Sequence, residues 1–441
     1  MNLAKLFFMQ LQRAILIPLL TFAFIAFPCD EHDLTATESS SRTILSGNAR
    51  DGYTLLYNSE PYSIKGVGGD KHLDLLARLG GNTIRTWGVG PETEKLLDEA
   101  HQNGLAVTLG IWLQHERHGF NYRNKDNLEE QRQIVLAAVE RFKNHPALLC
   151  WGLGNEMEGV TGEGADSAIW KEVNYLAEEI KKLDPYHPII SVVANVNPAK
   201  VKAIKRYAPE LDILGINAYA GASGLADKLR QYSWDKPYVL TEFGPPGPWE
   251  VAHTDWNAPI EPSSFEKMSH YYASHQDVIE DEKQCLGSFA FLWGNKQEAT
   301  ASWFGMLLED GCKLPVADTM SYLWNQKWPD NRSPLLKDAD IPFANLKVKA
   351  TQAFTVRATY SDPDEDSLDY QWSVFAESSD RRIGGDKEQV PDEFKSSIIS
   401  VKSRGRATIQ MPEKEGAYRL YVTVRDGKGG AAIDNWPFYV K

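Results

Sequence analysis

Short apolar runs alternate with amphipathic stretches from about residue 62 to residue 294. Eight runs rich in Val, Ile, Leu and aromatic residues are typical of strands buried on both faces of a parallel sheet. The stretches between them have helical spacing, and residues 72–80 place Leu73, Leu76 and Leu79 on one face. The predicted strands are 62–69, 83–89, 106–113, 148–156, 189–195, 213–219, 238–244 and 287–294, and the clearest predicted helices are 72–80, 91–104, 127–146 and 165–185.

Eight strands interleaved with helices predict a (β/α)8 TIM barrel, which we assign to residues 46–328. A doubly wound open sheet is the structural alternative. It would be expected to carry a phosphate-binding glycine fingerprint after its first strand, and the "KGVGG" of residues 65–69 lacks that spacing. The strand count therefore favours the barrel.

The pattern changes after residue 328. Residues 329–344 are rich in Pro and polar side chains, which indicates a linker. Residues 345–441 contain period-two runs separated by Asp, Gly and Pro turns, which predicts a small antiparallel β-sandwich. Within this segment, "YSDPDEDSLDYQWSV" and "YVTVRDGKGGAAID" resemble immunoglobulin-like modules of the PKD or cadherin-like type. Its Asp-rich stretches are interpreted as turns rather than as a calcium site.

The first residues of the chain carry an export pattern. The basic residues Lys5 and Arg13 come before an apolar run over 14–28. This run is short for a membrane span. The run ends at Cys29 and is followed by a polar segment over 30–45. Residues 1–29 therefore predict an export signal. An apolar run that ends at Cys resembles a bacterial lipoprotein signal, which implies a lipidated Cys29 and attachment to the membrane in the cell envelope; the alternative is an ordinary cleavage site and a secreted protein.

Composition narrows the class of partner. The net charge of −13 argues against a protein that binds nucleic acid through phosphate contacts. The 13 Trp and 18 Tyr include flat amphipathic rings that suit sugar faces, although core packing accounts for most of them. Four Cys in 441 residues do not form a disulfide framework.

Two glutamates end predicted barrel strands on opposite sides. Glu156 ends the fourth predicted strand and Glu242 ends the seventh, and reactive groups of such barrels collect where the strands end. Cleavage of a glycosidic bond needs a proton for the leaving oxygen and a negative partner for the oxocarbenium-like carbon. Two apposed acids also shift each other's titration, so that one stays protonated near neutral pH. We therefore expect a glycosidase without a cofactor, with Glu156 as acid and base and Glu242 as nucleophile.

The segments "NHPALLCWGLGNEME" and "VLTEFG" resemble the acid/base and nucleophile segments of clan A glycoside hydrolases, especially the family 2 barrel. The resemblance covers about residues 55–293 and implies retaining cleavage of β-glycosidic bonds in an oligosaccharide or polysaccharide. It also implies roles for four further residues. Arg85 would lie beside the nucleophile and favour its ionised form, Asn155 would bond the sugar 2-hydroxyl, Tyr219 would touch the nucleophile, and Trp293 would lie under the reacting sugar.

Trp87, Trp112 and His115 are further candidates for the walls of the cleft. We expect Glu158 on its exposed rim, and Asn217 as a hydrogen-bonding residue behind the substrate contacts. His115 and His118 could suggest zinc, but no third ligand with suitable spacing appears, so we expect no metal. The sequence departs from family 2 because no sandwich domain precedes the barrel, which favours an open cleft and a β-glucan-type chain. Two alternatives stay open: a non-catalytic carbohydrate-binding surface protein, and a transglycosylase that uses the same two glutamates.

Overall fold

The computed structural model describes residues 40–158, 162–279, 281, 283–382, 384–402 and 405–441. The predicted export signal and Cys29 lie outside the described residues. The contacts within the chain separate Met1–Ser39 from Ser40–Lys441, and the fold below is that of the second unit. In the part of the chain that the structure describes, the helices are too short or too polar to cross a membrane.

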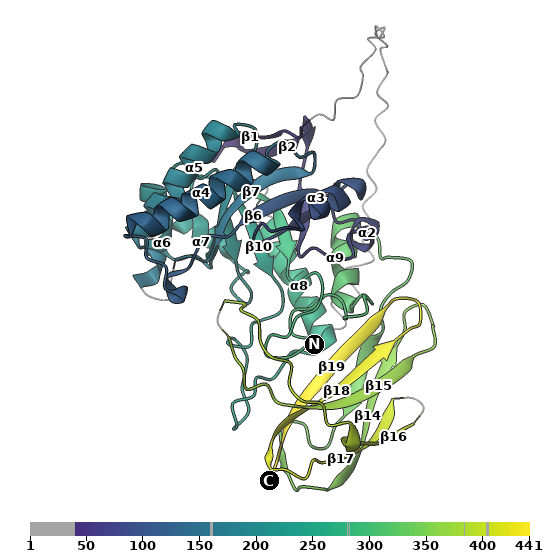
Figure 1. The fold of residues 1–441 in the computed structure, drawn as a ribbon. Helices are drawn as coiled ribbons and strands as arrows, with labels where there is room; N and C mark the ends of the chain where they lie inside the picture. Colours follow the sequence, from purple (N-terminus) through teal and green to yellow (C-terminus); the bar gives the residue numbers. More distant parts are fainter. Residues whose placement is uncertain (1–39, 159–161, 280, 282, 383, 403–404) are drawn as a thin grey trace, which may run out of the picture. The chain divides into compact units, whose positions relative to one another are not determined.

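A closed barrel of eight parallel strands forms the centre of this unit (Figure 1), which confirms the predicted barrel. Each strand runs in chain order beside the next, and β11 closes the ring against β4. The strands are β4 (Ile64–Gly68), β5 (Thr83–Arg85), β6 (Ala106–Ile111), β7 (Leu148–Asn155), β8 (Ile189–Ala194), β9 (Ile213–Asn217), β10 (Tyr238–Phe243) and β11 (Cys285–Ala290).

A helix follows each barrel strand and packs an apolar face on the ring. In α5, for example, Trp170, Val173 and Leu176 are buried while Lys171, Glu178 and Lys182 are exposed, and Asp166 caps its first turn. The helices are α2 (Leu73–Arg78), α3 (Thr93–Gln102), α4 (Lys125–Phe142), α5 (Ser167–Leu183), α6 (Pro198–Tyr207), α7 (Leu225–Gln231), α8 (Ser264–Ile279) and α9 (Pro315–Asn325). The four helices named from the sequence are all present, with ends up to four residues from the predicted bounds.

A small sheet of β1 (Thr43–Asn48), β2 (Gly52–Tyr57) and β3 (Glu60–Pro61) precedes the barrel. Leu55 of β2 is buried in one cluster with Ile64, Leu149 and Ile190, which lie near the beginnings of barrel strands. The small sheet therefore covers the barrel end opposite to Glu156 and Glu242, and the other end stays free for a site.

The C-terminal residues form two four-stranded sheets that share one core, in which Val356 and Ile409 of one sheet meet Trp372 and Leu420 of the other. The first sheet has the order β12 (Leu335–Asp340), β14 (Ala353–Ser361), β17 (Arg406–Gln410), β16 (Ile398–Lys402). The second has the order β13 (Lys347–Val348), β19 (Ala431–Val440), β18 (Gly416–Arg425), β15 (Asp369–Ala376). We call these residues the C-terminal module.

Two predicted boundaries differ from the structure. The first separated a polar linker over 30–45 from the barrel, and it falls inside β1. Residues 329–344 were expected to be a linker, yet β12 lies inside this range and pairs with β14 over Leu335–Asp340. Its polar composition reflects an edge strand with one exposed face, which composition alone does not distinguish from a linker. The Asp-rich stretch forms a turn as expected, because Asp362 Oδ1 accepts bonds from the backbone N–H groups of Asp364 and Asp366.

The module is bound to the barrel by buried polar contacts. The carboxylate of Asp434 in β19 accepts bonds from the backbone N–H and the hydroxyl of Ser264 at the start of α8, at 2.6 and 2.8 Å. The buried Arg419 of β18 donates to the carbonyl oxygen of Pro259 at 2.8 Å. These contacts fix the module beside the loops that follow β10 and β11.

Candidate active site

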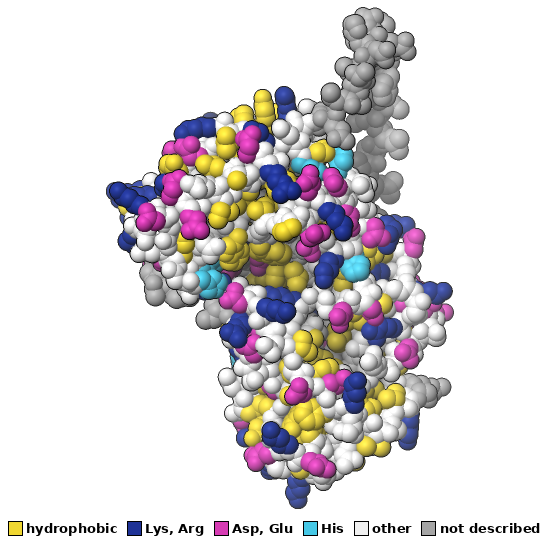
Figure 2. Space-filling view, in the orientation of Figure 1, with side chains coloured by type: hydrophobic (Ala, Val, Ile, Leu, Met, Phe, Trp, Pro, Cys, Tyr) yellow, Lys and Arg dark blue, Asp and Glu magenta, His cyan; other side chains and the backbone are white. Residues whose placement is uncertain are grey.

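A cavity of about 900 Å³ lies at the carboxyl ends of the barrel strands, and both Glu156 and Glu242 line it. Figure 2 shows the hollow, with apolar side chains gathered inside it. Aromatic side chains of Trp87, Trp112 and Tyr219 contribute to its walls. Its volume is near the upper end of the usual range for ligand pockets, about 300–1,000 Å³, and leaves room for more than one sugar ring.

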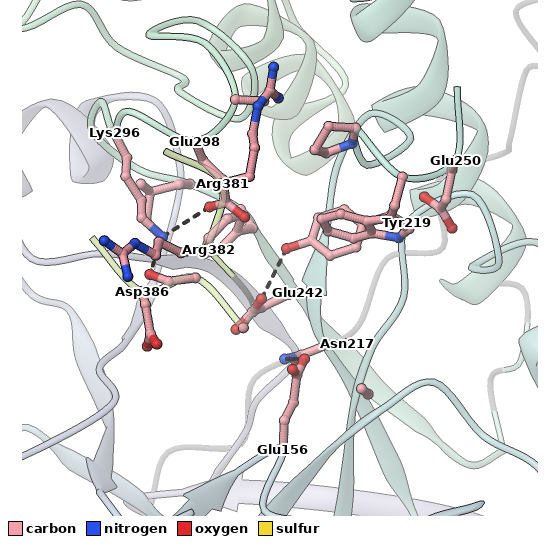
Figure 3. Close-up of a pocket in the computed structure, with 18 of the residues that line it drawn as sticks. Glu156, Asn217, Tyr219, Glu242, Glu250, Lys296, Glu298, Arg381, Arg382 and Asp386 are labelled. Atoms are coloured by element: carbon pink, nitrogen blue, oxygen red, sulfur yellow. Dashed lines mark hydrogen bonds and ion pairs between the residues drawn. The ribbon is translucent and has the colours of Figure 1, made fainter. Parts of the chain in front are cut away.

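Glu242 is held by three donors at the end of β10. Its Oε1 accepts bonds from Arg85 Nη1 at 2.9 Å and from Trp87 Nε1 at 3.0 Å. Its Oε2 accepts a bond from the Tyr219 hydroxyl at 3.0 Å (Figure 3). Arg85 is itself buried, and it also donates to the carbonyl oxygen of Thr241. This set of donors stabilises a carboxylate anion in a fixed orientation.

Glu156 directly follows β7, where the strand ends in a tight turn. Gly154 and Glu156 have φ values of 75° and 52°, both in the left-handed region. A Cβ atom at position 154 would lie 2.1 Å from Met157 Sδ, so this position requires glycine. The turn directs the Glu156 carboxylate into the cavity, which explains why glycine comes just before the Asn-Glu pair.

The surroundings of Glu156 differ from those of Glu242. Removal from water raises its pKa to about 7, and the nearby Glu242 charge acts in the same direction. One hydrogen bond opposes this shift, from Asn217 Nδ2 to Glu156 Oε1 at 2.7 Å. A carboxyl group with this pKa is largely protonated just below neutral pH and can exchange its proton during a reaction.

A continuous chain of hydrogen bonds links the two glutamates. Asn217 Nδ2, at the end of β9, also approaches Asn155 Oδ1 at 3.2 Å, and the same oxygen accepts a bond from Arg85 Nη2 at 2.7 Å. Because both bonds use its oxygen, the amide nitrogen of Asn155 is the part that can donate to a ligand in the cavity. The predicted residues Arg85, Asn155 and Tyr219 thus lie together with the two acids.

The other three predicted residues are Trp112, His115 and Trp293, and they differ in whether they line the main cavity. Trp112 lines the cavity, and His115 stacks behind it with ring centroids 4.7 Å apart. Burial lowers the pKa of His115 to about 4, so it is neutral at ordinary pH. Trp293 lines a smaller neighbouring cavity of about 140 Å³ and donates to the carbonyl oxygen of Lys71 at 2.7 Å. Phe291 and Leu292, from the same loop, line the main cavity instead.

Sequence reasoning did not assign direct contacts to Trp87 and Asn217, each of which bonds one of the two acids. Both residues lie at or just after strand ends, and this position was the signal available. Glu158 was expected on the exposed rim, but it is buried and forms an ion pair with Lys200 at 2.9 Å. Among the described residues, no group of three or more His, Cys, Asp or Glu side chains is arranged to hold a metal ion.

The barrel is similar to barrels of known proteins. Residues 71–247 match the family described as "Glycosyl hydrolases family 2, TIM barrel domain", which confirms for the barrel the resemblance predicted from its two carboxylate segments. A β-glucuronidase from Paenibacillus borealis is 27% identical over 219 residues, covering 42% of this chain and 34% of that protein. The human β-glucuronidase is 28% identical over 194 residues, covering 42% of this chain and 25% of that protein.

Solved structures show the same fold. A calcium-binding mutant of Bacteroides uniformis β-glucuronidase 2 superposes with a TM-score of 0.51 at 16% identity, over 90% of this chain and 48% of that one. The β-glucuronidase of Ruminococcus gnavus gives a TM-score of 0.51 at 17% identity, over 66% of this chain and 53% of that one. The chain thus spans about half or less of the length of these proteins. The family match and the relatives thus make the barrel similar to those of glycosidases, which are enzymes that hydrolyse O-glycosyl bonds.

Proposed function

We propose that the protein is a retaining β-glycosidase that acts by double displacement. In the first step the Glu242 carboxylate attacks the anomeric carbon, while Glu156 donates its proton to the leaving oxygen. In the second step Glu156, now ionised, takes a proton from water, and the water oxygen displaces Glu242 from the sugar. The net reaction consumes one water molecule and returns both carboxyl groups to their starting states.

One observation carries this proposal: the two apposed acids have opposite surroundings. Glu242 receives three donors, one of them cationic, which suits a nucleophile that must be ionised. Glu156 is removed from water and receives one neutral donor, which raises its pKa and suits a proton donor. This division of roles is the one that glycosidic cleavage requires.

The proposal is tested with 4-nitrophenyl β-glycosides and two variants. We expect Glu242→Ala and Glu156→Ala each to lose most of the wild-type activity. Added azide distinguishes their roles, because it fits the space left by either carboxylate. Azide should restore turnover of Glu242→Ala with a product of inverted configuration, and of Glu156→Ala with a product of retained configuration. Retained products from both variants would refute the assignment of Glu242 as nucleophile.

The same assay can identify which sugar the enzyme cleaves. The sequence suggested a β-glucan-type chain, and the relatives named above act on β-glucuronides; a panel of β-glucosides, β-glucuronides and β-galactosides compares these possibilities directly. A non-catalytic carbohydrate-binding protein would leave the whole panel intact in wild type. Product analysis with added sugar acceptors separates hydrolysis from transglycosylation.

We also propose the finer features that the sequence suggested for the two ends of the chain. The C-terminal module is an immunoglobulin-like module of the PKD or cadherin-like type. The protein is exported, and Cys29 carries the lipid that attaches it to the membrane. Membrane fractionation of wild type and Cys29→Ala tests the second point, since only the wild type should sediment with membranes.

A further inference from the structure

One wall of the catalytic cavity comes from the C-terminal module. A long loop of the module connects β15 to η3 (Lys395–Ser397). We call residues 377–382 and 384–393 the module loop. Figure 3 shows Arg381, Arg382 and Asp386 of this loop beside Lys296 and Glu298, on the other side of the cavity from Tyr219 and Glu250. The module residues that line the cavity are Arg381, Arg382, Gly384, Gly385, Asp386 and Glu388.

Buried and short contacts attach the module loop to the barrel loop that follows β11. The buried carboxylate of Glu388 accepts a bond from the backbone N–H of Ala299 at 2.7 Å and from that of Arg382 at 3.1 Å. Lys296 Nζ donates to the carbonyl oxygen of Gly385 at 2.6 Å and pairs with Glu298 at 2.9 Å. These contacts hold the module loop in place, so it forms a fixed wall of the cavity.

The charges at the base of the module loop leave one guanidinium without a carboxylate of its own. Glu377 accepts two bonds at 2.9 Å from Arg419, which is almost completely buried. Arg381 approaches the same Glu377 Oε1 at 2.9 Å and thus shares an anion that Arg419 already neutralises. Arg382 pairs with Asp380. These five side chains carry three positive and two negative charges.

Exposure increases from the floor of the cavity toward this wall. The side chain of Glu242 is 8% exposed, that of Lys296 is 25%, that of Arg381 is 35% and that of Arg382 is 55%. The two arginines therefore lie nearer the mouth than the reacting groups do. A ligand part that meets them extends outward from the sugar held at Glu242.

We propose that Arg381 and Arg382 form a subsite for an acidic group, a carboxylate or a sulfate, on a sugar unit beyond the one that is cleaved. The guanidinium group suits this role because its N–H donors match two oxygens of such an anion at once. Across the cavity, the 62% exposed Trp249 packs edge-on against Tyr219 and offers an apolar face to the same part of the substrate. This inference rests on the proposed glycosidase function and assigns it an acidic oligosaccharide as substrate class.

The test uses three forms of one tetrasaccharide, built from the sugar whose 4-nitrophenyl glycoside the enzyme cleaves: unmodified, carboxylated and sulfated. Each is measured as a competitive inhibitor of the full-length protein and, by calorimetry, as a ligand of Glu242→Ala. The wild type should bind at least one acidic form about tenfold or more tightly than the neutral form. Arg381→Ala and Arg382→Ala should each remove about tenfold of that preference, the lower end of the value of a hydrogen bond between charged groups.

The controls distinguish the loss of a direct contact with the ligand from a general disturbance of the fold. Arg357→Ala removes an exposed module arginine that pairs with Asp338 outside the cavity, and it should leave all binding constants unchanged. Hydrolysis of the 4-nitrophenyl glycoside by Arg357→Ala should also equal that of wild type, because this side chain lies outside the cavity. Equal wild-type affinity for the three tetrasaccharides would overturn the proposal, as would an equal loss on every ligand. Failure of wild type to cleave any aryl glycoside would instead overturn the proposed function.

Discussion

The hydrogen bond from Asn217 to Glu156 makes a quantitative prediction about pH dependence. Asn217 Nδ2 lies 2.7 Å from Glu156 Oε1 and is the donor that lowers the pKa of this carboxyl against the effect of burial. Asn217→Ala removes the donor and leaves the burial and the charge of Glu242 in place. The ionised form of Glu156 loses stabilisation, whereas the protonated form loses little, so the pKa must rise.

The size of the rise follows from the value of the bond. A hydrogen bond to a charged group contributes about 1.5–3 kcal/mol, and one pKa unit corresponds to about 1.4 kcal/mol. Loss of the bond therefore predicts a rise of about 1–2 units. Water can enter the space left by the amide and replace part of the bond, so we expect the lower value, from about 7 to about 8.

The assay is kcat/KM against pH for an aryl glycoside whose leaving group needs protonation. Activity requires the protonated form of Glu156, so the basic limb of the profile reports its pKa in the free enzyme. Asn217→Ala should move this limb upward by about one unit. Asn195→Ala is the matched control, because Asn195 lines the same cavity and its side-chain oxygen accepts a bond from the backbone N–H of Val196. An unmoved limb, or one that moves downward, in Asn217→Ala would refute the reasoning.

Three further predictions concern single side chains. Because the pKa of Glu156 is raised from 4.5 to about 7, its ionised form costs folding free energy that is absent below about pH 4.5 and complete above about pH 7. Denaturant unfolding should therefore find Glu156→Gln more stable than wild type at pH 8, by at most about 3 kcal/mol, and equally stable at pH 4. Tyr219→Phe removes the hydroxyl bonded to Glu242, so steady-state assays should give a kcat/KM about 10–100-fold lower with the melting temperature little changed. Arg419→Ala removes two of the bonds to the Glu377 carboxylate and leaves it only the more exposed Arg381 as a cationic partner, which should lower the free energy of unfolding by about 3 kcal/mol in urea titrations; a smaller loss in a double variant with Glu377→Gln would support this cause.

The barrel was predictable because its physics is local and repetitive. Strands buried on both faces need continuous apolar runs, and each of the eight runs became a barrel strand. The meeting of Glu156 and Glu242 then followed from topology, since the ends of all strands in such a barrel open on one face. The sequence needed no side-chain detail for this step.

The hydrogen-bond partners of Glu156 and Glu242 were harder to predict from the sequence. Trp87 was expected only as a possible wall residue, yet its ring nitrogen bonds Glu242 directly. Trp293 was expected beneath the sugar, yet its ring nitrogen points to a backbone oxygen beside a smaller cavity. Each outcome depends on a rotation of a side chain about its own bonds, and spacing along the chain does not fix such a rotation.

The contribution of the C-terminal module to the cavity could not be predicted, for a different reason. The stretch "ESSDRRIGGDKEQVPDE" has no apolar periodicity and reads as an ordinary connection between strands. Its contacts lie far along the chain, since Glu388 and Ala299 are 89 positions apart. The packing of the module against the barrel brings this stretch over the cavity.

That packing also bears on what the module does. A spacer would meet the barrel through exposed, interchangeable side chains, and its loops would not need buried charges. Here Glu388 is buried and satisfied by two backbone N–H groups, one from each side of the contact, so either side alone would leave it with half of its bonds. Arg117 of the barrel packs on Gly384, where a Cβ atom would lie 2.6 Å from its Nη2, and pairs with Asp386. The barrel and the module loop therefore complete each other at the cavity, which is built from the two together.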